Sequence, residues 1–129
     1  MTDYEKVVDV FFSTIRQKYE LPDDLVTQWF YMAVGDFELD IKPIYYDETT
    51  QIFGVYGANA AVINTLGLMM AKYYVKREQS RINKLNNIIG RDIQLNATGD
   101  AKKAVQAELE NILFEIEQKL FKQKKHSFS

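Results

Sequence analysis

The stretch INTLGLMMAKYYVKREQSR, residues 63 to 81, decides the fold, because it starts apolar on every side and ends charged. On a helix of about 100° per residue, its bulky side chains and the one just before them fall on one side. These are Val62, Leu66, Met69, Met70 and Tyr73. Small residues fall on the opposite side, namely Ala60, Asn64, Gly67 and Ala71. We therefore predict a long helix over residues 58–84 that is packed between neighbours on two sides.

Cations continue the bulky side of this helix, at Arg77, Arg81 and Lys84. Burying three unpaired cations is costly, so we expect the helix to leave the core near Tyr74 and to project into solvent. Its end would then carry the segment 85–99. The alternative is that the cations pair with Glu78 and the acidic first half of the chain, or simply lie in water.

Three more helices are expected, over residues 4–19, 22–39 and 101–125. Pro22 suits a first helical position, and Asp100 or Thr98 would cap the last helix. The expected core lines are Val8, Phe12, Ile15 and Tyr19; Val26, Phe30, Ala33 and Phe37; and Val105, Leu109, Ile112, Ile116 and Leu120.

The connections complete a mainly α fold. Residues 40–57 hold β-formers on both sides of a polar turn, which favours a loose β-hairpin. Residues 85–99 are rich in Asn and Gly, and are expected to form a long loop with extended character at 88–95. The prediction is one domain, 1–129: a small bundle of about four helices with a long third and fourth helix, a possible short β-hairpin and a long loop.

Charge divides the chain into unlike halves. Residues 1–64 hold 4 Lys/Arg and 11 Asp/Glu, whereas residues 65–129 hold 12 and 7. Such a division suits head-to-tail self-association if the halves are separate in space, and a solvated surface is the alternative. The net charge of −2 does not indicate a general affinity for nucleic acids.

The residues of common catalytic sites are scarce. The chain has no Cys, its single His is His126 near the C-terminus, and no glycine-rich phosphate loop is present. Asp36, Glu38 and Asp40 lie close in sequence but splay around a helix end. We therefore expect no enzyme activity, no cofactor and no metal. A membrane span is not expected either, because the most apolar run, 58–75, is interrupted by two asparagines and a lysine.

Two segments resemble the head–tail connector family of long-tailed bacteriophages, also called adaptor or head-completion proteins. They are LPDDLVTQWFYMAVGDFELDI, residues 21–41, and AAVINTLGLMMAKYYVKREQS, residues 60–80. A third stretch, INKLNNIIGRDIQLNATGDAKKA at 82–104, is similar to a form found in phages of Gram-positive hosts. The resemblance covers roughly residues 5–125 and is closest over 20–82. Residues 40–57 have no counterpart in it.

The resemblance implies a structural protein of the virion neck, assembled in the bacterial host cytoplasm. Members form helical rings, usually of twelve copies, that sit beneath the portal after DNA packaging. The ring receives the stopper, which is the next neck protein, and double-stranded DNA passes through its channel without sequence-specific contacts.

The resemblance also implies site residues. Docking on the portal would fall to the C-terminal segment, residues 114–129, with Leu120, Phe121, Lys122, Lys124, Lys125 and Phe128. The loop 85–99 would face the channel or a neighbouring ring. Apart from the resemblance, the basic tip of the projecting helix, at Arg77, Arg81, Lys84 and Arg91, would contact a neighbouring subunit or DNA in the channel.

Two alternatives belong to other functional classes. One is a small nucleic-acid-binding regulator that uses the projecting basic helix, although no helix-turn-helix signature supports it. The other is a small metal enzyme with Asp36, Glu38 and Asp40 as ligands.

Overall fold

The computed structural model describes residues 1–15, 21–54, 59–89 and 96–127; for 83–89, 96–102 and 126–127 it describes the backbone alone. Four helices and one short hairpin make up this part of the chain, which confirms the predicted mainly α bundle. The elements are α1 Asp3–Ile15, α2 Asp23–Asp40, β1 Tyr46–Asp47, β2 Ile52–Phe53, α3 Ala60–Ile89 and α4 Asn96–Ser127.

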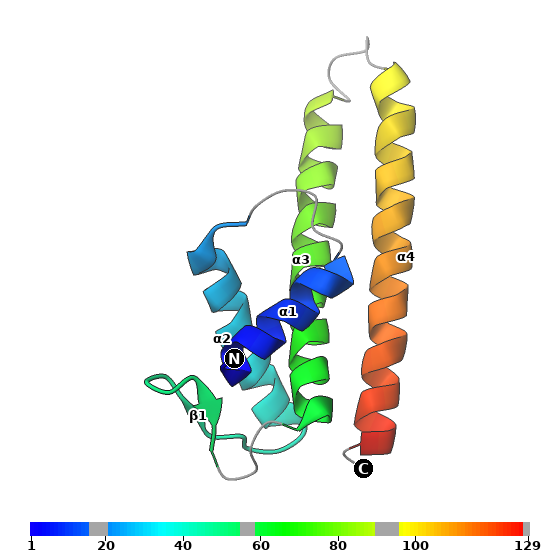
Figure 1. Cartoon of the computed structure of the whole chain (residues 1–129). Helices are drawn as coiled ribbons and strands as arrows, with labels where there is room; N and C mark the ends of the chain where they lie inside the picture. The colour runs from blue at the N-terminus through cyan, green and yellow to red at the C-terminus, as the bar shows by residue number, and fades with distance from the viewer. Residues whose placement is uncertain (16–20, 55–58, 90–95, 128–129) are drawn as a thin grey trace.

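Helix α3 is the centre of the molecule. Helices α1, α2 and α4 all pack on it; α1 crosses it, whereas α4 runs antiparallel beside it (Figure 1). The second half of α3 and the first half of α4 extend beyond α1 and α2 as a two-helix projection (Figure 1). The predicted projection is thus present, and α4 accompanies it.

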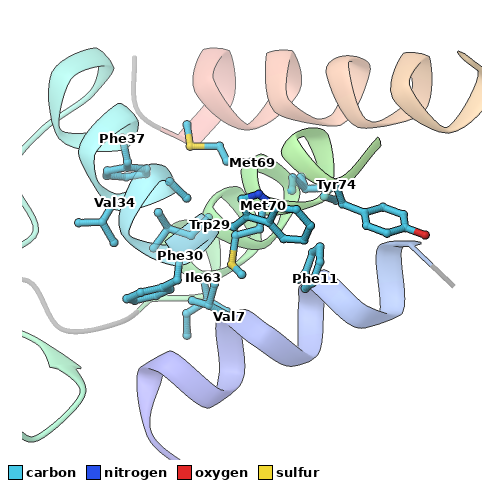
Figure 2. Close-up of a cluster of buried hydrophobic side chains, with 14 of the residues drawn as sticks. Val7, Phe11, Trp29, Phe30, Val34, Phe37, Ile63, Met69, Met70 and Tyr74 are labelled. Carbon is cyan, nitrogen blue, oxygen red and sulfur yellow. The ribbon is translucent and has the colours of Figure 1, made fainter. Parts of the chain in front are cut away.

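The core lies where α1, α2 and the first half of α3 meet (Figure 2). Its largest fully buried side chains include Phe11 of α1, Phe30 and Phe37 of α2, and Leu66 and Met70 of α3. The predicted apolar line of α2 is buried throughout, as is the bulky line of α3 except for the half-buried Tyr73. Val75 is the last buried residue of α3 up to residue 82, which places the end of the core one residue beyond Tyr74.

The small side of α3 is packed by α1. A Cβ placed on Gly67 would lie 2.7 Å from the Cβ of Val10 and 3.2 Å from the backbone nitrogen of Phe11. The backbones of the two helices therefore approach closely at this one residue, as the row of small residues predicts.

The predicted core line of α1 is confirmed at Ile15 and wrong by one position at its first two members. The buried residues are Val7, Phe11 and Ile15, whereas Val8 and Phe12 are only half-buried. Both lines have helical spacing, and the contact of α1 with Gly67 selects the former. Tyr19, the fourth predicted member, lies outside the described residues.

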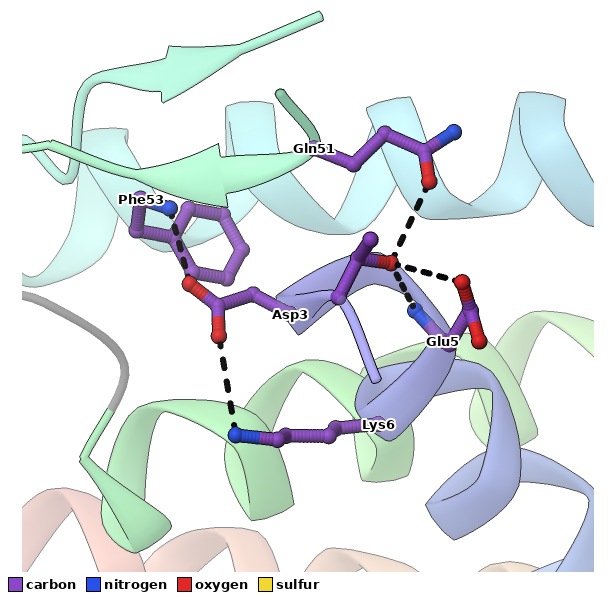
Figure 3. Close-up of polar contacts among 6 residues, drawn as sticks. Asp3, Glu5, Lys6, Gln51 and Phe53 are labelled. Carbon is purple, nitrogen blue, oxygen red and sulfur yellow. Dashed lines mark hydrogen bonds and ion pairs between the residues drawn. The ribbon is translucent and has the colours of Figure 1, made fainter.

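The hairpin is present and is tied to the start of α1 (Figure 3). Tyr46 pairs with Phe53 in an antiparallel register, and the backbone N–H of Phe53 donates to the buried Asp3 carboxylate at 2.9 Å. Thr2 caps α1, because its hydroxyl accepts from the backbone N–H of Glu5 at 3.2 Å. A charged side chain at the helix start thus positions a strand fifty residues away.

The predicted long loop is mostly helical. Helix α3 continues to Ile89 and α4 begins at Asn96, so residues 85–89 and 96–99 of the expected loop are helical. The extended character expected over 88–95 is wrong for residues 88 and 89, and residues 90–95 lie outside the described part. The expected caps Thr98 and Asp100 lie inside α4. Relative to alanine, an Asn in a helix interior costs only about 0.7 kcal/mol and a Gly about 1 kcal/mol. Packing between two long antiparallel helices outweighs these small costs.

Candidate functional site

The inward side of α4 belongs to the core of the chain. Leu109, Ile116 and Leu120 are buried against the rest of the bundle. Leu120 was expected to dock on a portal, but it is only 7% exposed and lies beside Met69 and Tyr73 of α3. It therefore holds α4 in place and is not open to a partner.

Polar contacts fasten α4 to α2 and α3 at the same level. The Lys124 ammonium lies 3.4 Å from the Asp40 carboxylate, and the Lys72 ammonium lies 3.8 Å from Glu117. Lys124, another expected docking residue, thus makes a contact within the chain. We call these contacts, with the hydrogen bond described next, the polar clasp.

Tyr73 and Asp36 form the third contact of the polar clasp. The Tyr73 hydroxyl donates to the Asp36 carboxylate. Burial, and then this hydrogen bond, raise the pKa of Tyr73 well above its usual range. The phenol therefore stays protonated and keeps its role as donor at any physiological pH.

The polar clasp engages two of the three carboxylates of the metal-enzyme alternative. Asp36 accepts a hydrogen bond from Tyr73 and Asp40 pairs with Lys124, whereas Glu38 takes no part in the clasp. In the described part of the chain, no three His, Cys, Asp or Glu side chains are grouped as metal ligands would be. The sequence offered no sign of the Tyr73–Asp36 pair, because its members are far apart in the chain.

The outward side of α4 carries two exposed phenylalanines. Phe114 is 61% exposed and Phe121 is 64% exposed, and both line a shallow hollow with Glu117, Gln118 and Lys122. The ammonium of Lys125 lies 5.7 Å from the centre of the Phe121 ring, within cation–π range. We call Phe114, Gln118 and Phe121 the outer α4 face.

The outer α4 face contains part of the predicted docking set. Phe121, Lys122 and Lys125 are exposed, as docking requires. Phe128 lies outside the described residues. Phe114 was predicted only as the first residue of the docking segment. Its spacing of seven residues from Phe121 places both on one side of a helix and could have identified it.

The basic residues of the projection are partly neutralised. Arg77 and Arg81 both reach the Glu78 carboxylate, at 3.3 Å and 3.0 Å. This agrees with the alternative in which the cations pair locally. Lys84 lies in α3, but its side chain is outside the described part, as is the whole of Arg91. The structure thus places two of the four expected contact residues, and it places them around one carboxylate.

Comparison with models of protein families, with curated proteins and with solved structures found no match for this chain. Across the described residues, none of the helices combines the length and the apolar character needed to cross a membrane.

Proposed function

We propose that this chain is a structural neck protein of a long-tailed bacteriophage. It forms a ring, with twelve copies as the expected number, beneath the portal. It joins the DNA-filled head to the tail, receives the stopper and lets double-stranded DNA pass. The proposal draws on the resemblance of residues 20–82 to head–tail connectors and on the surfaces that the fold leaves open.

The observation that carries the proposal is the outer α4 face. The opposite side of α4 already buries Leu109, Ile116 and Leu120, so the fold gains little from Phe114 and Phe121. Neighbouring exposed aromatic side chains with a basic rim are typical of protein–protein contacts. A chain of this kind acts by binding other proteins.

Portal docking is proposed for the C-terminal segment, residues 114–129. Its cations are concentrated at the end: Lys122 and Lys125 are exposed, and no acidic residue follows Glu117. A basic helix end attracts an acidic partner surface and speeds encounter with it.

The ring is supported by the division of charge. Acidic residues are concentrated in the first half of the chain and cations in the second half. A ring made of one kind of subunit needs contacts between two different faces, and opposite charges favour such a pairing over like-with-like association.

The nucleic-acid-binding alternative has less support, because Arg77 and Arg81 share the Glu78 carboxylate. As a regulator, the isolated protein would bind duplex DNA with a strong salt dependence, about one unit of log–log slope per phosphate contact. As a connector, it would bind DNA weakly and without sequence preference.

Truncation after Leu120 tests the docking segment. We expect the shortened chain to keep its helical circular dichroism spectrum, because the buried residues of α4 remain, and to lose binding to purified portal rings. Binding equal to that of the full chain would contradict the assignment.

Two double variants test whether portal binding depends on the cations at the C-terminal end of α4 or on any exposed cation. Lys122→Ala with Lys125→Ala should weaken portal binding. Lys76→Ala with Lys103→Ala removes two other exposed cations, on the projection, and should leave portal binding unchanged.

A further inference from the structure

The hairpin region contains two residues in the left-handed region of φ, which residues other than glycine seldom adopt. They are Tyr45, with a φ of 51°, and Gln51, with a φ of 58°. The fold explains Gln51, because this residue closes the turn of the hairpin. Its backbone N–H donates to the carbonyl oxygen of Asp47 at 2.7 Å, and its own carbonyl oxygen accepts from the backbone N–H of Tyr4 at 3.3 Å.

Tyr45 differs from Gln51, because its side chain is 56% exposed. The fold uses the backbone of this residue: its carbonyl oxygen accepts from the backbone N–H of Gly54 at 2.8 Å. Any residue can supply that oxygen, and glycine would do so without the cost of a left-handed side chain. A strained, bulky and exposed residue of this kind indicates a function outside the fold.

The side of the hairpin on which Tyr45 lies can be identified from Gly54. A Cβ placed on Gly54 would lie 3.1 Å from the Cβ of Tyr45, so both residues face the same side. Because successive strand residues alternate, Ile52 faces this side too and is 48% exposed, whereas Phe53 is buried on the other side. Asp47 lies opposite Ile52 in the register. We call Tyr45, Asp47 and Ile52 the outer hairpin face.

The surroundings of the outer hairpin face are acidic. Residues 45–54 include Asp47 and Glu48, both exposed, and no Lys or Arg. Helix α2, whose Tyr31 ring lies 6.1 Å from that of Tyr46, carries five Asp/Glu and no Lys or Arg. Burial is the main reason that the pKa of Tyr46 is raised to about 12, and the charges of Glu48 and Asp47 add to the shift. Both carboxylates therefore lie near the tyrosines of the hairpin.

We propose that the outer hairpin face binds an arginine-bearing segment of a partner protein. A guanidinium group can stack on the Tyr45 ring and pair with the carboxylate of Asp47 or Glu48, a combination for which lysine is less suited. One oxygen of Asp47 accepts from the backbone N–H of Thr49 at 2.9 Å, which holds this carboxylate in place. Ile52 provides apolar surface for the methylene stem of the arginine.

This inference goes beyond portal docking, because it gives the chain a second binding surface of opposite charge. The C-terminal end of α4 is basic and suits an acidic partner, whereas the outer hairpin face is acidic and suits a basic one. Two partners can therefore be told apart by the sign of their charge.

The outer hairpin face is fixed to α1 and α2 before any partner binds (Figure 3). The backbone N–H of Phe53 donates to the buried Asp3, and the Thr2 hydroxyl donates to the side-chain oxygen of Gln51 at 3.2 Å. The Phe53 ring also stacks on that of Phe30, at 6.3 Å between centres. A surface that is ordered in advance loses less entropy on binding, so this short hairpin can serve as a docking platform.

Titration of the full chain with a hexaarginine peptide, followed by NMR, tests the proposal. We expect the amide signals of residues 45–52 to shift most, and hexalysine to bind more weakly. Tyr45→Gly keeps the net charge and suits the positive φ. It should leave the melting temperature unchanged or raise it, and weaken hexaarginine binding about two- to fivefold, the size of one exposed cation–π contact.

Two control variants keep the charge as well. Tyr45→Phe retains the ring and should bind hexaarginine like the natural chain. Leu39→Ala removes a side chain that is 86% exposed on the acidic helix α2, away from the hairpin, and should also bind like the natural chain.

Three results would overturn the proposal. Equal affinity of Tyr45→Gly and the natural chain would show attraction by net charge alone. A lower melting temperature of Tyr45→Gly would show that the ring serves the fold. Dimerisation that depends on Tyr45, without binding of hexaarginine, would assign the face to a second copy. The neck assignment is judged separately, by the phenotype of a gene deletion.

Discussion

We call the part of the molecule where α1, α2, the hairpin and the first half of α3 meet the base. The base buries its aromatic residues, whereas the second half of α4 exposes them. In the base, the ring of Phe30 is fully buried and lies 4.8 Å from that of Tyr4 and 4.9 Å from that of Tyr46, centre to centre. On α4, Phe114 and Phe121 are 61% and 64% exposed. The contrast teaches that the core does not use the α4 aromatics, which leaves them available for the contacts with other proteins proposed above.

Phe30→Ala should have the largest effect on the stability of the base. We expect a loss of about 3–5 kcal/mol in the free energy of unfolding, because the change removes a buried ring and leaves a cavity. Denaturant unfolding followed by circular dichroism measures the loss. If Phe30→Ala lost less stability than a substitution at an exposed position, Phe30 would not be central to the core.

Gly67→Ala tests the close approach of α1 to α3. The added methyl group collides with Val10, so we expect a destabilisation of about 1–3 kcal/mol despite the better helix propensity of alanine. Gly35→Ala is the matched control, since it adds the same group on a helix where nothing lies within 4 Å. If Gly35→Ala lost as much stability as Gly67→Ala, the close packing of α1 on α3 would be contradicted.

Alkaline pH should weaken the packing of the hairpin on α2. Burial, and next the neighbouring Tyr31, raise the pKa of Tyr46 to about 12 from the usual 10.0. In the unfolded chain this phenol ionises near pH 10, so the stabilisation is complete below pH 10 and is lost as the pH rises toward 12. Between pH 10 and 12 the melting temperature of the natural chain should fall relative to that of Tyr46→Phe, which has no phenol to ionise; a constant difference would refute the shift.

Phe121→Ala should have the smallest effect on stability, within about 0.5 kcal/mol, because its ring is mostly in water. The same substitution should reduce binding to purified portal rings. Equilibrium unfolding and portal binding, measured on one preparation, sharpen the contrast with Phe30→Ala. A stability loss comparable to that of Phe30→Ala would place Phe121 in the core.

The sequence predicts the base better than the ends of the helices. The line from Val26 to Phe37 is strongly periodic, and the small residues around Gly67 indicate a close neighbour, so both predictions are confirmed. The line of α1 is displaced by one residue because two helical lines are nearly equal in apolar content. The contact that selects one of them lies in a distant part of the chain.

The candidate site is predicted only in part. The exposure of Phe121, Lys122 and Lys125 could be predicted, because they lie near the end of a helix that has apolar residues on one side only. The burial of Leu120 and the pairing of Lys124 with Asp40 depend on how α4 docks on α2 and α3, which no local pattern specifies. The helical residues 85–89 and 96–99, which were expected in a loop, depend in the same way on packing between α3 and α4.

The central claim is that this chain joins a phage head to its tail. The most direct measurement is electron microscopy of a lysate from the parent phage with the gene deleted. The account predicts DNA-packed or leaking heads beside separate, finished tails, with assembly restored by the gene supplied in trans. Normal virions in the deletion lysate would contradict it.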